Sequence, residues 1–368
     1  MKVICNRGAL LDAINQAGAV ANARSPKPAL ACVKLTADSD RLTIAATDLE
    51  VAVCCSDSEV QVDQPGETLV PVDKLRDIVR ESIDDSLSLQ TEAEQIVIKG
   101  HDSLFRIYTQ KPEDFPPVPD FEGNPDFEIK AGTLKQAISQ TLFAAAREPQ
   151  RYAFNGVLFN IKGKRLEMVA SDGRRLAMAH AELLSVGKEL GRSKVIVPTK
   201  ALNLVDKLLT DPGESVSVQL HENQVMFHTA QATATSNLID GQFPPYEDVI
   251  PKDSDRKMTA STADLLSAVR RAALLTSNDN KGVRMSFTKT GLVLSSRQAD
   301  AGEATINFPC KFEGADIEVG FNPFFLTDAL RVVNCDEVHF ELTAPNRPGM
   351  LRAGSGEFIY VIMPVSLT

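Results

Sequence analysis

The chain has 368 residues, which predicts two to three domains at about 150 residues per domain. Hydrophobic residues make up 43% and charged residues 24%, a composition of folded globular proteins that excludes disordered and collagen-like chains. The 49 acidic residues outnumber the 39 basic ones, and the formal net charge of −10 excludes a surface that attracts polyanions everywhere. Nucleic acid could bind only through a local basic surface.

The cysteines show neither a C-x-x-C spacing nor a regular pairing interval, which favours buried thiols in a reducing compartment over disulfides or a zinc site. Asn6, Arg7 and Asp12 interrupt the apolar stretch that a signal peptide would need, and no segment is long and apolar enough to span a bilayer. We therefore expect a cytoplasmic protein. The six cysteines are Cys5, Cys32, Cys54, Cys55, Cys310 and Cys335.

A helix-start pattern occurs three times, at residues 10–14, 134–138 and 265–269, each time after a short strand-like run. A second pattern is a strand that runs into a polar or proline-containing helix entry. It occurs around Leu75, Leu202 and Leu326, which are 127 and 124 residues apart. The chain therefore contains three copies of one large unit.

Strand-like runs separate the helices of each copy. Residues 42–48 and 166–172 are two of them, and their terminal aspartates are 124 residues apart. Further strands follow the second helix of a copy, as at residues 95–99 and 104–108. Each copy reads strand, helix, strands, helix, strands, which predicts an α+β fold with two helices packed on antiparallel sheets.

Proline and acidic residues mark the joints between copies, at residues 115–120 and 243–255. The period exceeds the range of about 20–50 residues that is typical of solenoid repeats, so each copy is a whole domain. We predict tandem domains at residues 1–122, 123–253 and 254–368.

Four ordered motifs carry a resemblance to a known family. They are residues 151–157 (RYAFNGV), 171–177 (SDGRRLA), 240–244 (DGQFP) and 360–365 (YVIMPV). With the threefold repeat, they make the whole chain similar to the bacterial sliding clamp, the β subunit of DNA polymerase III. The resemblance implies a homodimeric head-to-tail ring that encircles duplex DNA for processive replication. Implied partners are DNA polymerase III α subunit, the clamp loader and other clamp-motif proteins.

Domain size bears on how many copies such a ring needs. A domain of about 120 residues has a radius of gyration near ~14 Å, which puts neighbouring domain centres about 30 Å apart. Three domains in a triangle leave almost no hole, whereas six in a hexagon leave a channel of about 30 Å. We therefore expect two chains, related by a rotation that closes the ring.

The predicted helices and the segments that follow them carry eleven basic and seven acidic residues, a net charge of +4 that leaves −14 for the rest. Such helices would hold phosphates diffusely without reading bases. For each residue the alternative is a charge that only solvates a helix face, and for Tyr152 it is core packing instead of base stacking. The residues expected to contact DNA are Arg24, Lys74, Arg80, Lys135, Arg147, Arg151, Tyr152, Lys200, Lys207 and Arg270.

The resemblance also implies a pocket between the second and third domains for short partner segments with glutamine and apolar anchors. Ser366, Glu247 and Asp248 stand where relatives can be basic, which leaves the peptide preference open. Taken singly, Leu176, Val361 and Met363 are also typical core residues. The implied pocket residues are Phe154, Ser171, Gly173, Arg174, Arg175, Leu176, Pro244, Val249, Val361, Met363, Pro364, Val365 and Leu367.

For ring closure the resemblance implies that Phe105 and Ile107 of one chain meet Leu274 and Leu275 of the other. Asp300 and Glu303 are the implied acidic partners of Lys99 or Arg106. Joining two sheet edges would satisfy backbone groups that otherwise invite aggregation. The alternative is an ordinary buried strand and helix.

The sequence has no phosphate loop and no G-x-G-x-x-G, H-E-x-x-H or G-x-S-x-G motif, and its five histidines lack metal-ligand spacing. We therefore expect no catalytic site, no metal and no cofactor. Two alternatives stay open. The first is a threefold-repeat scaffold that binds peptides without encircling DNA, and the second is an enzyme of unrecognised type.

Overall fold

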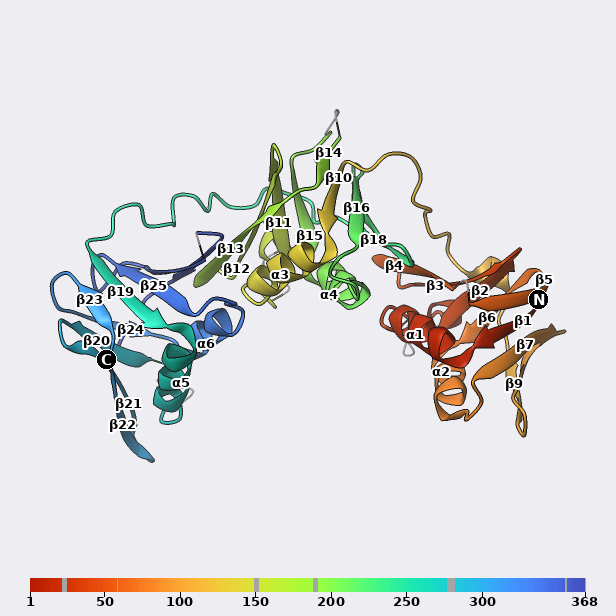
Figure 1. Ribbon diagram of the computed structural model, residues 1–368, viewed down its shortest axis with the longest axis horizontal. Helices are drawn as coiled ribbons and strands as arrows, with labels where there is room; N and C mark the ends of the chain where they lie inside the picture. Colours follow the sequence, from red (N-terminus) through yellow and green to blue (C-terminus); the bar gives the residue numbers. More distant parts are fainter. Residues whose placement is uncertain are drawn as a thin grey trace. The chain divides into compact units, whose positions relative to one another are not determined.

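The computed structural model describes residues 1–21, 25–57, 59–148, 152–187, 191–276, 282–354 and 356–367. The chain forms two compact units, each with two antiparallel sheets (Figure 1). The first unit comprises Met1–Gly132, Leu183–Arg192 and Lys200–Leu238, and the second Thr133–Glu182, Ser193–Thr199 and Ile239–Thr368. No described helix is long and apolar enough to cross a membrane.

The first unit contains a five-stranded and a nine-stranded sheet. The five-stranded sheet has the order β5 (Val60–Gln64), β1 (Lys2–Asn6), β7 (Ser86–Glu92), β8 (Gln95–Lys99) and β9 (Leu104–Tyr108). The nine-stranded sheet has the order β14 (Ser185–Val186), β10 (Phe127–Lys130), β16 (Ser215–Leu220), β17 (Gln224–His228), β18 (Ala232–Asn237), β4 (Val51–Asp57), β3 (Arg41–Thr47), β2 (Cys32–Asp38) and β6 (Gly66–Pro71).

The second unit contains a nine-stranded and a four-stranded sheet. The nine-stranded sheet has the order β15 (Lys194–Pro198), β11 (Gly156–Lys162), β12 (Arg165–Ser171), β13 (Arg175–Glu182), β27 (Phe358–Ile362), β26 (Gly349–Ala353), β25 (Glu337–Leu342), β19 (Arg256–Ser261) and β23 (Lys311–Glu313). The four-stranded sheet has the order β22 (Gly302–Phe308), β21 (Gly291–Gln298), β20 (Val283–Thr288) and β24 (Ile317–Phe321).

The strand order confirms the threefold repeat. Each of three successive stretches of chain supplies one five-stranded and one four-stranded half. The halves join where β18 pairs with β4 and where β27 pairs with β13. In the part of the chain that the structure describes, β9 and β22 pair on one side only. The domain boundaries at 122 and 253 stay a prediction.

Six α-helices occur in the described residues: α1 (Arg7–Gly18), α2 (Val72–Glu81), α3 (Ala131–Leu142), α4 (Thr199–Leu208), α5 (Thr262–Ala273) and α6 (Pro323–Arg331). Local side chains define several starts. Asn6 Oδ1 accepts from the Gly8 and Ala9 N–H groups, and Asn322 caps α6 in the same way through Phe324 N–H. Helices α1 and α2 pack together, as do α5 and α6. Both predicted helix-start patterns are therefore confirmed.

Some strands alternate buried and more exposed residues, which places their apolar faces in the cores, whereas β11 and β27 are buried along nearly their whole length. Strand β2 is an example of the alternation, with Val33 and Leu35 fully buried. All six cysteines are free thiols; Cys5, Cys32 and Cys55 are buried and the other three are half-buried. The described part of the chain also contains three short 3₁₀ helices, Pro28–Ala31, Pro112–Asp114 and Tyr152–Asn155.

Candidate functional site

The turn between β12 and β13 is formed by the motif at residues 171–175. Ser171 Oγ donates to the Arg175 carbonyl at 2.8 Å and accepts from Gly173 N–H at 3.1 Å. Asp172 Oδ1 accepts from Arg174 and Arg175 N–H at 2.9 and 3.0 Å. Gly173 has φ +83°, which favours glycine. All these bonds join residues within four positions of each other, so the motif can specify this turn without help from distant parts of the chain.

The same turn occurs 124 residues earlier, between β3 and β4. Thr47 Oγ1 donates to the Val51 carbonyl and accepts from Leu49 N–H, and Asp48 Oδ1 accepts from Glu50 and Val51 N–H. Leu49 has φ +80°, so a leucine occupies the left-handed conformation that glycine holds in the second copy. The two turns are thus repeats of one device at the two joins between sheet halves.

The arginine after Arg174 has a structural role. The Arg175 side chain is 9% exposed and its guanidinium donates to Asp172, to Asp328 of α6 and to the Phe143 carbonyl, at 3.1, 2.8 and 2.8 Å. It also lies over the Phe325 ring, 4.3 Å from the centroid. Arg175 therefore ties the turn to α6 and to the segment after α3.

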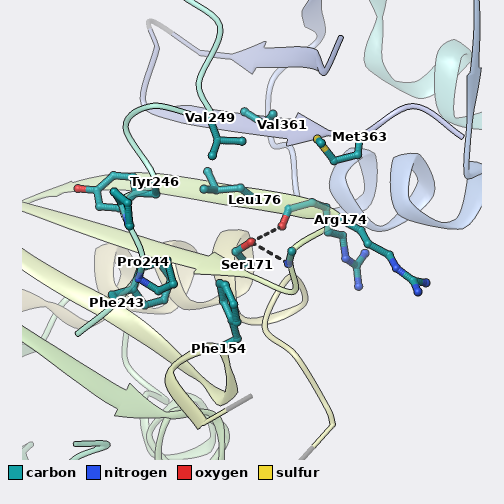
Figure 2. Close-up of a pocket in the computed structure, with 13 residues that line it drawn as sticks. Phe154, Ser171, Arg174, Leu176, Phe243, Pro244, Tyr246, Val249, Val361 and Met363 are labelled. Carbon is teal, nitrogen blue, oxygen red and sulfur yellow. Dashed lines mark hydrogen bonds between the residues drawn. The ribbon is translucent and has the colours of Figure 1, made fainter. Parts of the chain in front are cut away.

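Next to this turn lies an apolar pocket of about 180 Å³ (Figure 2). Leu176 of β13 and Val361 of β27, which are paired in register, form part of its wall. The volume is below the range of about 300–1,000 Å³ that drug-sized ligands occupy, so it suits one or two side chains. The lining residues are Phe154, Ser171, Gly173, Arg174, Arg175, Leu176, Phe243, Pro244, Pro245, Tyr246, Val249, Val361 and Met363.

Tyr246 fixes the segment that forms one side of the pocket. Its ring is buried and packs against Leu176 and Val361 in one core cluster. Its hydroxyl donates to Glu167, and Asn160 Nδ2 donates to the same hydroxyl at 3.2 Å. Burial, followed by the bond to Glu167, raises the pKa of Tyr246. A segment without regular secondary structure is thereby fastened to the sheet.

Glu167 is the centre of this buried polar cluster. It accepts from Asn160 at 2.9 Å and from Lys162 at 3.1 Å, and it lies 3.1 Å from His180 Nε2. The bond with His180, and then those with Tyr246, Lys162 and Asn160, lower its pKa against the opposing effect of burial. The Glu167 side chain is only 11% exposed, and these hydrogen bonds compensate its carboxylate for the water that it loses on burial.

The structure brings ten of the thirteen implied pocket residues together, all except Pro364, Val365 and Leu367. Val365 N–H instead donates to the Gly320 carbonyl at 2.9 Å, and Leu367 packs on Gly320 and lines a different cavity. The sequence analysis missed Phe243, Pro245 and Tyr246 as pocket residues. Their signal is the Phe-Pro-Pro-Tyr run at residues 243–246, which the sequence analysis assigns to a joint and, for Phe243, also to a family motif.

The residues predicted to contact DNA are dispersed over the helices. Arg24 and Arg151 lie outside the described residues, as does the side chain of Tyr152. Lys74, Arg80, Lys135, Lys207 and Arg270 are exposed on α2, α3, α4 and α5, and Arg147 is exposed after α3. Arg80 pairs with Asp77 and Glu81, both at 3.0 Å.

Lys200, the remaining predicted DNA contact, lies at the first turn of α4. It forms ion pairs with Asp48 and Glu50 of the β3–β4 turn. Burial lowers the pKa of Lys200, but these two carboxylates outweigh it and the net shift is upward. A DNA phosphate would therefore have to displace two carboxylates to bind Lys200. Lys207 forms no such ion pair among the described residues.

The observed helices carry ten basic and seven acidic residues, a net charge of +3 in a chain of net −10. The value differs from the predicted +4 because Arg24 and Arg147 fall outside the helices and Arg7 falls inside α1. The helices are still less acidic than the remaining chain.

Of the residues implied in ring closure, Phe105 and Ile107 lie on the edge strand β9, and Leu274 and Leu275 directly follow α5. Phe105 is 39% exposed on β9 and Leu274 is 77% exposed after α5, whereas Ile107 is buried at 8% and Leu275 is half-buried. Glu303 is exposed on β22 and Asp300 on the turn before it. The sequence analysis missed two further exposed apolar residues on β9, namely Leu104 and Tyr108.

A triplicated arrangement of five-stranded and four-stranded halves, with helices of net positive charge and an apolar pocket beside one join, defines a modular binding protein of the DNA-clamp class. The N-terminal, central and C-terminal domain families of the DNA polymerase III β subunit match residues 1–119, 128–245 and 247–366. The chain belongs to this family.

Individual relatives agree over the full length. The chain is 31% identical to the β sliding clamps of Pseudomonas aeruginosa and Escherichia coli, with 100% of each chain covered. A crystal structure of the P. aeruginosa clamp bound to griselimycin superposes with a TM-score of 0.94 at 31% identity, again over 100% of both chains. As a member of this family, the chain is a DNA sliding clamp and not an enzyme. These findings do not favour the alternative of a scaffold that binds peptides without encircling DNA.

Proposed function

We propose that two copies of this chain close head to tail into a ring around duplex DNA and tether a replicative polymerase to it. The observation that carries the proposal is that, among the described strands, one five-stranded and one four-stranded half are not joined to another half. Strand β9 ends a five-stranded sheet and β22 ends a four-stranded sheet. Pairing β9 of one copy with β22 of the other gives a nine-stranded sheet of the same composition as the two inside the chain.

Strand equivalence supports this pairing. Strands β9, β18 and β27 are equivalent, because each ends a five-stranded half. Strands β22, β4 and β13 are equivalent in the same way, because each ends a four-stranded half. The proposed contact would therefore repeat the β18–β4 and β27–β13 joins. Three domains at residues 1–122, 123–253 and 254–368 in each of two copies give the six modules that a DNA-sized channel needs.

Within the ring, exposed basic residues on the helices would contact phosphates and leave the bases unread. Lys207 and Arg270 are well suited, since among the described residues neither forms an ion pair that would compete with DNA. The remaining proposed contacts are Arg24, Lys74, Arg80, Lys135, Arg147, Arg151 and Tyr152, with Lys200 the weakest candidate because of its two carboxylate partners.

The apolar pocket beside the β12–β13 turn is proposed to bind the polymerase III α subunit, the clamp loader and other clamp-motif proteins, in the cytoplasm. Its size and apolar wall suit the side-chain anchors of a short segment. Crystal structures of the sliding clamps of P. aeruginosa and Bartonella birtlesii contain bound griselimycin, which supports the presence of a ligand site on this fold.

Sedimentation tests the ring. The wild-type protein should have twice the 39.9 kDa chain mass at micromolar concentration. Leu274→Asp should shift it toward a single chain, because it places a charge in the proposed contact, while Leu184→Asp, at another exposed leucine, should not. A wild-type monomer, or a dimer that Leu274→Asp leaves intact, would contradict the proposed closure.

Retention on DNA tests the channel. Lys207→Glu with Arg270→Glu should shorten the lifetime of loaded protein on circular duplex, whereas Lys164→Glu with Lys252→Glu, the same charge change off the helices, should not. Equal retention of both variants would remove the helices from the DNA contact.

A further inference from the structure

Opposite charges flank the apolar pocket. Arg174 lines it beside Gly173, and Glu247 and Asp248 lie between two other lining residues, Tyr246 and Val249. In Figure 2, Tyr246 lies to one side of Leu176 and Arg174 to the other. The pocket therefore has a basic flank and an acidic flank.

The basic flank continues into a polar cavity of about 320 Å³ that shares Arg174 with the pocket. Two of its acids, Asp172 and Asp328, are already bonded to Arg175. Arg174 is exposed, and no ion pair holds its guanidinium within the described chain. Arg147 of the same cavity is also exposed and likewise forms no ion pair among the described residues, and the remaining acid of the described lining is Glu148.

The acidic flank is equally available. Glu247 and Asp248 are exposed and form no ion pair in the ranges that the structure describes. Tyr246 is fastened to Glu167 and Val249 N–H donates to the Tyr246 carbonyl at 3.1 Å, so the backbone that carries both acids is held in place. Their charge is thus presented at a fixed side of the pocket.

We infer that this pocket selects segments whose apolar anchors are flanked by an acidic residue on the Arg174 side and a basic residue on the side of Glu247 and Asp248. The inference rests on the proposed function of the pocket and adds the charge pattern of its ligand. Charges at the rim of an apolar contact set specificity and orientation through complementarity, and they penalise the reversed arrangement.

Three labelled peptides test it. All share a glutamine and the same apolar anchors; one has an acidic residue before and a basic residue after the anchors, one has the reverse order, and one is neutral. At low salt the two charged peptides should differ about tenfold in Kd, or about 1.4 kcal/mol, with the neutral one between. The difference should shrink as salt rises.

A charge-reversed protein provides the decisive comparison. Arg174→Glu combined with Glu247→Lys and Asp248→Lys should invert the order of the two charged peptides. The control Lys164→Glu with Glu94→Lys and Glu222→Lys makes the same changes at exposed sites away from the pocket and should keep the wild-type order. Charged peptides of equal affinity, or an order that does not invert, would overturn the charge inference while the neutral peptide still binds. Failure of all three peptides to bind would overturn the pocket assignment itself.

Discussion

The hydroxyl of Tyr246 should hold one side of the pocket, and Tyr246→Phe removes only that hydroxyl. It donates to the buried Glu167 carboxylate and accepts from Asn160, while the ring packs with Leu176 and Val361. Phenylalanine keeps the ring contacts, including the edge-on contact with Phe243 at 6.2 Å between centroids. The substitution therefore isolates the polar anchor.

The magnitude follows from the remaining partners. A hydrogen bond to a charged group is worth about 1.5–3 kcal/mol. Glu167 keeps Asn160, Lys162 and His180, so the loss should fall at the low end, about 1.5 kcal/mol. Because about 1.4 kcal/mol is a factor of ten, local opening of the segment around Tyr246 should become about tenfold more frequent.

Amide hydrogen exchange of residues 239–253 measures this opening, and the Val249 N–H that is bonded to the Tyr246 carbonyl is the most direct probe. Tyr108→Phe, at a 74% exposed tyrosine, is the matched control and should leave exchange in this segment unchanged. The variant should also weaken pocket peptides. Equal exchange in both variants would refute the anchoring argument.

The pH dependence of the effect has a definite sign. The pKa of Glu167 is lowered in the fold, chiefly by His180, so its contribution is fully present above the unfolded pKa of about 4.3 and is lost as pH falls below it. The pKa of Tyr246 is raised, so its hydroxyl stays protonated at neutral pH. Neither Glu167 nor Tyr246 therefore changes its protonation between about pH 6 and 8, and titration of these two groups should not alter the effect of Tyr246→Phe in that range.

Three further changes test other parts of the structure. Leu49→Gly should stabilise the protein by up to about 1 kcal/mol in thermal unfolding, because φ +80° favours glycine and the leucine is 51% exposed; a loss of stability would contradict this. Arg175→Lys should destabilise by about 2–3 kcal/mol, since an ammonium cannot reproduce the three guanidinium contacts, whereas Arg174→Lys should cost less than about 0.5 kcal/mol. Burial raises the pKa of Cys55 to about 12 and of Cys32 and Cys54 to about 11, so iodoacetamide at pH 8 should label these thiols rapidly only after denaturation.

Features that depend on neighbours a few residues away could be predicted from the sequence. The helix starts at Asn6 and Asn322 are fixed by caps within three residues, and the turn at Ser171 is fixed by bonds within four. The threefold repeat followed from the recurrence of these signals at intervals of about 125 residues. Ten pocket residues followed from the resemblance, and the four family motifs contain all of them except Val249.

The tertiary structure alone decided which face each residue presents and which distant residues meet. Strand periodicity puts Phe105 and Ile107 on one face, yet it cannot tell that Ile107 is covered while Phe105 is partly exposed. Lys200 meets carboxylates 150 and 152 positions away, and Leu367 packs on Gly320 instead of entering the pocket. These pairings depend on the path of the whole chain, since a side chain's long-range partners are chosen by sheet register and helix packing, which no short window of sequence contains.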